Sequence, residues 1–186
     1  MLTKEQIVNN LKKLGEELKA KDLNGEIIIT GGASMCLVHS ARDMTQDIDA
    51  IYEPKSVINE LVKKIAKENN LPADWLNDSV KGFVNENIET VEFATLGNLK
   101  IATVTPEYLL AMKLLSARVT GQDYNDIKFL LRKLDITSTR EAYEIIERMF
   151  PVNLILPKTM YVLEQCLEEI KVEGQESLKY ENGIEI

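Results

Sequence analysis

The sequence predicts an α+β protein, in which a small mixed β-sheet is followed by a helical C-terminal half. Short runs of β-branched residues are concentrated before residue 105, whereas apolar residues at helical spacing dominate after it. Hydrophobic residues make up 45% of the 186 residues, which excludes an intrinsically disordered chain. We therefore expect an α/β core over residues 1–104, a helical subdomain over 105–175 and a flexible tail over 176–186.

Helices and strands alternate in the first seventy residues. Ile7, Leu11, Leu14 and Leu18 recur at helical spacing after Thr3, which is a favourable N-cap residue. A short β-branched run then ends at a glycine pair, and a second strand-like run begins at an acidic motif. The expected elements are a helix over 3–19, a strand over 26–30, a helix over 33–39, a strand over 47–52 and a helix over 54–69.

The remaining segments predict one short helix, one hairpin and four longer helices. Residues 72–79 predict the short helix, with Trp75 and Leu76 facing the core. Gly97-Asn98 lies between two strand-like runs and predicts a β-hairpin. The hairpin strands are expected over 90–96 and 99–104, and the helices over 105–118, 123–134, 139–149 and 158–170.

The composition excludes several classes of protein. The chain carries 22 Lys and Arg against 30 Asp and Glu, and the net charge of −8 disfavours indiscriminate binding to nucleic acid. Apolar runs fall far short of the ~20 residues that cross a bilayer. The N-terminal segment also lacks the apolar stretch of a secretory signal. We therefore expect a cytoplasmic protein with no membrane partner.

Cysteine and histidine are too few for the commonest metal and nucleophile sites. Cys36 and Cys166 lie far apart, without a Cys or His neighbour at metal-ligand spacing, so both are expected to be free thiols. His39 is the single histidine. A single histidine cannot form an HExxH zinc site, which needs two. The sequence also has no nucleophile elbow that would indicate a Ser-His-Asp triad.

The most distinctive motif is Asp47-Ile48-Asp49 on a predicted strand. Side chains at positions i and i+2 of a strand point to the same face, so these two carboxylates repel each other unless a cation lies between them. Mg²⁺ or Mn²⁺ takes such oxygen ligands and keeps positions open for water and triphosphate oxygens. The alternative is a solvent-facing strand whose exposed positions are acidic by chance.

A glycine pair precedes this motif at the end of the first predicted strand. Gly31 and Gly32 allow backbone N–H groups to approach a phosphate without an intervening Cβ, and Ser34 adds a hydroxyl. The pair matches neither a Walker loop nor a GxGxxG motif. A tight turn from strand to helix is the alternative explanation.

Together these motifs resemble the nucleotidyltransferase superfold of the DNA polymerase β type. The fuller pattern resembles the DUF6036 group of bacterial nucleotidyltransferases, which are relatives of the AbiEii and MenT toxins. The matching stretches are Gly31-Gly32-Ala33-Ser34 with Arg42, Thr45 and Asp47-Ile48-Asp49-Ala50, then residues 72–78 with 81–83, and residues 109–114 followed by 123–127. The resemblance implies that the predicted sheet is a nucleotidyltransferase core.

The resemblance implies further site residues in the helical half. In that group a lysine on a mid-chain helix and an aspartate on the next helix complete the site; Lys113 fits the first, and Asp123 and Asp126 are candidates for the second. Lys113 would neutralise triphosphate charge, although by spacing alone it could also snorkel to the surface. Asp123 could instead be a helix N-cap, and Asp126 an acid beside a positive helix end. Glu92 is a further candidate, as a third carboxylate of the site. The alternative is that it is a solvent-facing strand residue.

These residues predict a nucleotidyltransferase that uses Mg²⁺ or Mn²⁺ to transfer NMP from an NTP to a hydroxyl, RNA or protein acceptor. The expected catalytic residues are Asp47, Asp49, Lys113 and Asp126, of which Asp47 and Asp49 bind the metal. The expected nucleotide-binding residues are Gly31, Gly32, Ser34, Arg42, Thr45 and Asp123, although Arg42 and Thr45 could organise the loop instead. The resemblance also implies tRNA as an acceptor and an antitoxin protein as a partner. The alternatives are a non-catalytic nucleotide-sensing or partner-binding module on the same fold, and a structural adaptor.

Overall fold

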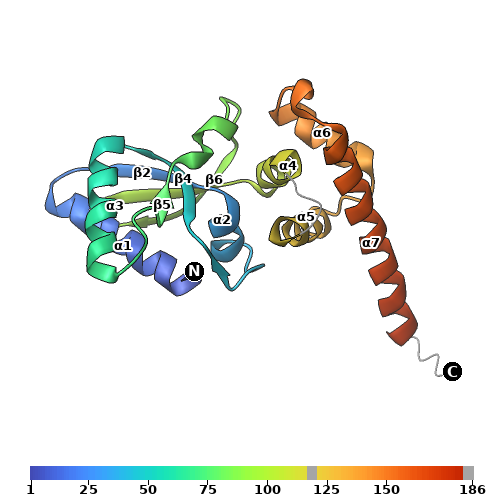
Figure 1. Ribbon diagram of the computed structural model, residues 1–186, viewed down its shortest axis with the longest axis horizontal. Coiled ribbons are helices and arrows are strands. Elements are labelled where there is room, and N and C mark those ends of the chain that lie inside the picture. The colour runs from blue at the N-terminus through green and yellow to red at the C-terminus, as the bar shows by residue number, and fades with distance from the viewer. Residues whose placement is uncertain (117–120, 182–186) are drawn as a thin grey trace. The chain divides into compact units, whose positions relative to one another are not determined.

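The structure is a computed structural model that describes residues 1–116 and 121–181, the last six of them by their backbone alone (Figure 1). It divides into two compact units, Met1–Thr105 and Pro106–Ile186. The first unit holds a mixed five-stranded sheet with helices, and the second is helical. The predicted α+β class is therefore confirmed.

The sheet of the first unit has the strand order β5-β4-β2-β7-β6. Strand β2 is antiparallel to β4 and parallel to β7, β4 is parallel to β5, and β6 and β7 form an antiparallel hairpin. A separate two-stranded ribbon pairs β1 with β3. The strands are β1 (Leu2–Thr3), β2 (Gly25–Ile29), β3 (Met44–Thr45), β4 (Ile48–Glu53), β5 (Leu76–Asn77), β6 (Thr90–Leu96) and β7 (Leu99–Val104).

Helices α1 (Lys4–Ala20) and α3 (Lys55–Asn69) lie side by side against the sheet (Figure 1). Thr3 caps α1 as predicted, in a capping box with Gln6. The apolar stripes of both helices are buried against alternate residues of β2, β4 and β7. The helix residues in this core are Ile7, Leu11, Leu14 and Leu18 on α1, and Ile58, Leu61, Val62 and Ile65 on α3.

The β6–β7 hairpin is held against α1 by a very close backbone approach. A Cβ on Gly15 would lie 1.8 Å from the carbonyl oxygen of Leu96, so only glycine fits at this position. The turn residue Gly97 has a positive φ of 59°, and the backbone N–H of Asn98 donates to the Gly15 carbonyl over 3.2 Å. Both predicted hairpin strands agree with the structure.

The predicted short helix over residues 72–79 is wrong. Strand β5 occupies Leu76–Asn77, and the 3₁₀ turn η1 follows it over Ser79–Phe83. The reason is a tertiary contact, because the carbonyl of Trp75 accepts a hydrogen bond from the backbone N–H of Ile48 over 2.8 Å and aligns the segment with β4. The inward orientation of Trp75 and Leu76 is confirmed, since both are buried.

Helix α2 (Gly31–Leu37) begins two residues earlier than predicted. Gly31 turns the chain at the end of β2 with a positive φ of 56° and becomes the first residue of the helix. His39, which was predicted to be helical, lies beyond the end of α2 and next to Ser40, whose φ of 50° continues the turn.

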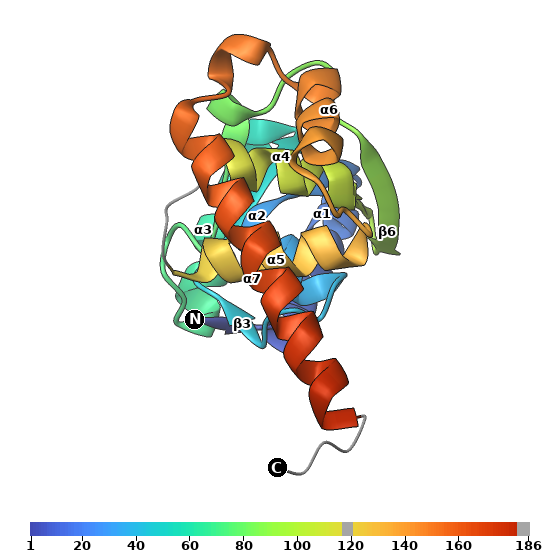
Figure 2. The ribbon, with the colours of Figure 1, turned by 90° about the vertical axis from the view of Figure 1, so that its right-hand side faces the viewer.

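The second unit contains four helices among its described residues: α4 (Pro106–Ser116), α5 (Gln122–Lys133), α6 (Thr139–Met149) and α7 (Pro157–Glu181), with the 3₁₀ turn η2 (Val152–Leu154). Helix α7 runs across α4 and α5 (Figure 2). The rings of Tyr108 and Phe150, with centroids 5.1 Å apart, join α4 to the end of α6. None of the described helices has the length and apolar character needed to cross a membrane.

Two predicted boundaries in this unit involve residues outside the described part of the chain. The predicted end of the first helix at residue 118 lies there, since α4 is described to Ser116. Helix α7 continues beyond the predicted end at residue 170, through the first six residues of the predicted tail to Glu181. The tail residues 182–186 lie outside the described residues.

Candidate functional site

The glycine corner and the acidic strand lie against each other in the first unit. Because β2 and β4 are antiparallel, the end of β2 meets the start of β4, and the backbone N–H of Thr30 donates to the Asp49 carbonyl over 2.9 Å. A Cβ on Gly31 would lie 3.2 Å from Oδ2 of Asp49. The absence of a Cβ therefore leaves room beside this carboxylate.

The second glycine contacts the loop that precedes the acidic strand. A Cβ on Gly32 would lie 2.5 Å from Oγ1 of Thr45 and 2.9 Å from Nη1 of Arg42. Thr45 belongs to β3 and pairs with Leu2 of β1, so the N-terminal residues of the chain hold this loop over the glycine pair. The fold thus places Arg42 and Thr45, which were predicted to bind the nucleotide or to organise the loop, next to Gly32.

Ser34 contributes an unusual polar group to the same region. The side chain is fully buried in α2, and its Oγ has no hydrogen-bond partner among the described residues. A buried hydroxyl without a partner costs free energy of folding, so such groups in native proteins call for a ligand or an ordered water. This orphaned hydroxyl follows the glycine pair by two residues.

Asp47 and Asp49 are half-buried, whereas Ile48 between them is fully buried. This alternation directs Ile48 to the core and both carboxylates away from it, as the strand period requires. Asp47 accepts a hydrogen bond at Oδ2 from Nδ2 of Asn77 over 3.0 Å. Asn77 lies in the 72–78 stretch that carries the family resemblance, but it was not predicted as a site residue, since its contact with Asp47 spans thirty residues of chain.

The two carboxylates fit a Mg²⁺ or Mn²⁺ ion as a partial ligand set. Both supply oxygen atoms, both are partly accessible, and the Gly31 corner leaves space beside Oδ2 of Asp49. Within the part of the chain that the structure describes, no group of three or more His, Cys, Asp or Glu side chains could hold a metal. Two carboxylates supply only part of the oxygen ligands that such an ion takes.

Glu92 lies too far from this pair to share a metal with it. It is an exposed residue of β6, and β6 is separated from β4 by three strand spacings. At about 4.8 Å for each spacing, Glu92 is about 14 Å across the sheet from the strand of Asp49. The solvent-facing alternative is therefore the better explanation of Glu92.

The predicted residues of the second unit form an ion-pair cluster on α4 and α5. Nζ of Lys113 lies 2.7 Å from Oδ2 of Asp126 and 2.7 Å from Oδ1 of Asp123. The lysine side chain is 7% exposed, so it does not snorkel to the surface. Asp123 does not cap α5, because the N-cap residue is Gly121. With one cation and two carboxylates, the cluster carries a formal charge of −1, so the charge of Lys113 is already compensated.

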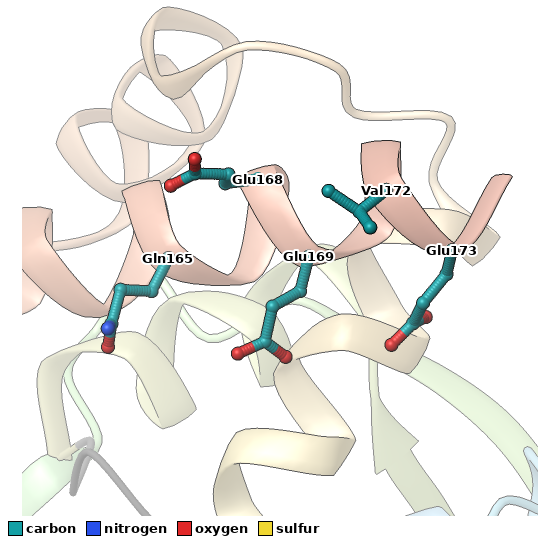
Figure 3. A pocket seen from close by; sticks show the side chains of 5 residues that line it. All are labelled: Gln165, Glu168, Glu169, Val172 and Glu173. Atoms are coloured by element: carbon teal, nitrogen blue, oxygen red, sulfur yellow. The ribbon is translucent and has the colours of Figure 1, made fainter. Parts of the chain in front are cut away.

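A shallow cavity of about 420 Å³ lies along α7 in the second unit (Figure 3). Lys128 contacts two of its lining carboxylates at 2.9 Å each, those of Glu169 and Glu173. Hydrogen bonds from Lys128 lower the pKa of both glutamates. The residues that line the cavity are Gln165, Glu168, Glu169, Val172 and Glu173. Since Lys128 is supplied by α5, this acidic surface contributes to helix packing.

Comparison with known proteins identifies the family. A sequence profile of the DUF6036 family, described as nucleotidyltransferases of unknown function, matches residues 7–153, which is most of the chain. The chain belongs to this family. The match confirms the predicted DUF6036 assignment and the enzyme class of nucleotidyltransferases, for which an NTP is the implied substrate. No curated protein and no solved structure matches the chain.

The DUF6036 match includes both groups of predicted residues. Its range contains the glycine corner and the acidic strand of the first unit, together with the Lys113 cluster of the second. It leaves out the helix α7 from Pro157 onward and therefore the acidic cavity. The predicted relation to the AbiEii and MenT toxins stays a prediction.

Proposed function

We propose that this DUF6036 chain is a metal-dependent nucleotidyltransferase whose metal ligands are Asp47 and Asp49. The observation that carries the proposal is the contact between Gly31 and Asp49, where a Cβ would lie 3.2 Å from Oδ2. A backbone without a side chain beside a half-buried, partly accessible carboxylate suits a polyphosphate that must approach both. The positive φ of Gly31 already favours glycine at this turn, and the proximity of Asp49 is the observation that relates the turn to the acidic motif.

The chain's own residues have separate roles in this proposal. Bound Mg²⁺ or Mn²⁺ would supply charge neutralisation and polarise the phosphoryl oxygens. Gly31 and Gly32 allow their backbone to approach the β- and γ-phosphates, and Ser34 offers its orphaned hydroxyl. Arg42, next to Gly32, compensates phosphate charge, while Thr45 holds the loop in place.

Lys113, Asp123 and Asp126 form the proposed contribution of the second unit. Asp126 is 1% exposed and fixes the lysine ammonium from the buried side. Asp123 is 44% exposed and is the partner that a substrate phosphate would displace. In that state Lys113 would balance charge on the leaving pyrophosphate.

A hydroxyl of RNA, a protein or a small molecule would attack the α-phosphorus of the NTP. The negative charge of the chain disfavours indiscriminate RNA binding, so an RNA acceptor would be recognised by shape or by its end. tRNA as acceptor, an antitoxin protein as partner and a cytoplasmic location extend this proposal by resemblance to the toxin families.

The experiment incubates the purified chain with each labelled NTP, Mg²⁺ or Mn²⁺, and either bulk RNA or total protein. We expect label transfer from one NTP and a higher melting temperature with that NTP and Mn²⁺. Asp47→Asn and Asp49→Asn should abolish both effects. Asp43→Asn is the matched control, because Asp43 is an exposed aspartate of the preceding loop. Absence of both transfer and nucleotide binding in the unmodified chain would refute the proposal.

The second candidate is a non-catalytic module that senses a nucleotide or binds a partner on the same fold. The observation that favours it is the double ion pair of Lys113, because a cation already compensated by Asp123 and Asp126 has less charge to offer a triphosphate. This candidate predicts nucleotide-dependent stabilisation without label transfer. Retention of that stabilisation in Asp47→Asn and Asp49→Asn would favour it further.

A further inference from the structure

The edge strand β5 pairs with β4 only at the acidic motif. Its two residues align with two of the motif, Leu76 with Ile48 and Asn77 with Asp49. The backbone N–H of Ile48 also donates to the Trp75 carbonyl over 2.8 Å. The segment before and within β5 therefore holds the backbone between the two aspartates from the side opposite to β2.

The side-chain amide of Asn77 has three hydrogen bonds. Its Nδ2 donates to Oδ2 of Asp47 over 3.0 Å and to the carbonyl of Asp74 over 3.4 Å. Its Oδ1 accepts from the backbone N–H of Ser79 over 3.0 Å. Because a backbone N–H can only donate, the Ser79 contact places Oδ1 on its side and directs Nδ2 toward the carboxylate.

We propose that Asn77 is a positioning residue that orients Asp47 for a divalent cation. The amide engages one carboxylate oxygen and leaves the other to the cation. As a neutral donor it fixes the carboxylate without cancelling its charge, and that charge is what a divalent cation requires. This inference deepens the proposed function and rests on it.

The neighbouring residue Asp78 shows what a charged partner does instead. Its carboxylate forms a salt bridge with Lys55, so its negative charge is compensated within the protein. The same Lys55 hydrogen bond lowers the pKa of Asp78. A lysine in place of Asn77 would compensate Asp47 in the same way and weaken its attraction for a cation.

The segment that carries Asn77 is anchored in the core of the first unit. Trp75 is fully buried, and its Nε1 donates to the carbonyl of Val62 on α3 over 3.1 Å. Leu76 is buried in the same core. An amide on a strand anchored in this way holds its partner with little freedom, which is the requirement for a second shell around a metal ligand.

The test measures Mn²⁺ binding directly, by water-proton relaxation of the full chain titrated with Mn²⁺ alone. Asn77→Ala and Asn77→Ser both remove the reach to Asp47, and Ser keeps a small polar group at the strand position. We expect Mn²⁺ to bind about 10–100-fold more weakly to both variants than to the unmodified chain. The matched control is Asn59→Ala, which removes a half-buried asparagine whose Oδ1 accepts from the Tyr52 hydroxyl.

The outcomes separate this inference from the proposed function. Asp47→Asn defines the binding level without the site. If the unmodified chain binds Mn²⁺ no better than Asp47→Asn, the proposed metal site is wrong and Asn77 has no such role. If the unmodified chain binds better and both Asn77 variants match it, the positioning role alone is overturned. A merely structural Asn77 would lower the melting temperature as Asn59→Ala does, with unchanged Mn²⁺ affinity.

Discussion

Oδ2 of Asp49 lies 3.2 Å from the position that a Cβ on Gly31 would occupy. Such a separation is tighter than ordinary van der Waals contact, so any side chain at residue 31 would displace the carboxylate by a few tenths of an ångström. Gly31 also has a φ of +56°, which side chains of L-residues rarely adopt. Two independent features therefore favour glycine at residue 31, its positive φ and its close approach to the proposed metal ligand.

Gly31→Ala should reduce both stability and metal binding. The left-handed backbone alone should lower the free energy of unfolding by about 1–2 kcal/mol. The displaced Asp49 carboxylate should also weaken Mn²⁺ binding, measured by the relaxation titration, beyond the loss of folded protein. Gly82→Ala is the control, because nothing lies within 4 Å of a Cβ at that position. Equal Mn²⁺ affinity of the two variants would contradict the role given to Gly31.

Gly15→Ala should be one of the most damaging substitutions in the first unit. Its Cβ would lie 1.8 Å from the Leu96 carbonyl oxygen, so α1 and the β6–β7 hairpin would have to separate. Overpacking of this kind typically lowers stability by about 1–3 kcal/mol, and rigid backbone on both sides favours the upper end. Denaturant unfolding followed by circular dichroism measures the loss. Stability equal to that of the unmodified chain would show that helix and hairpin are not locked together.

Elements with local signals were predictable from the sequence. Thr3 and Ser138 cap α1 and α6 through side-chain hydrogen bonds within three residues, and Gly97 marks the hairpin turn. Strand β5 was not, because its conformation depends on a partner strand nearly thirty residues away. Its two residues carry no alternating pattern, and the local sequence from Pro72 favours a helical turn instead.

The candidate site depends on such long-range contacts. The proximity of the glycine corner and Asp49 was predicted only through the family resemblance; its physical cause is the antiparallel pairing of β2 with β4, which the sequence pattern alone does not give. The partners of Lys113 were not predictable, since the spacing allowed either aspartate of α5 and the structure uses both, Asp123 and Asp126. Side-chain contacts between helices depend on their packing, which a single sequence does not specify.

The thiols should be unreactive in the folded protein. Cys36 and Cys166 are both buried and free. Burial raises the pKa of Cys166 to about 11, and only the thiolate reacts. At pH 8 about one thiol in a thousand would be ionised even with access. We expect Ellman's reagent to modify neither cysteine until denaturant is added. Rapid modification of the native chain at pH 8 would contradict the buried position of Cys166.

Acid should weaken the packing of α7 on α5. Glu169 and Glu173 have a pKa lowered by hydrogen bonds from Lys128, so their stabilising effect is complete above the unfolded pKa of about 4.3. It is lost as the pH falls below that value through the folded pKa. A Glu169→Gln/Glu173→Gln variant should melt lower than the unmodified chain at pH 7 but lose less on going to pH 3. If the variant and the unmodified chain lose the same amount of melting temperature between pH 7 and pH 3, the two glutamates do not stabilise the packing of α7 on α5 in this way.

Lys113→Met should destabilise the second unit, because it leaves a buried carboxylate without its cation. Asp126 is 1% exposed and accepts the ammonium at 2.7 Å, and breaking such a pair typically costs about 3–5 kcal/mol. The double variant Lys113→Met/Asp126→Leu should recover much of this loss, since it removes the buried charge together with its partner.

Lys133→Met, at an exposed position of the next helix, is the control and should change stability little. If Lys113→Met unfolds at the same denaturant concentration as Lys133→Met, the ion pair between Lys113 and Asp126 does not stabilise the second unit. Recovery of stability without recovery of label transfer in the double variant would show that the Lys113–Asp126 pair serves the reaction as well as the stability of the second unit.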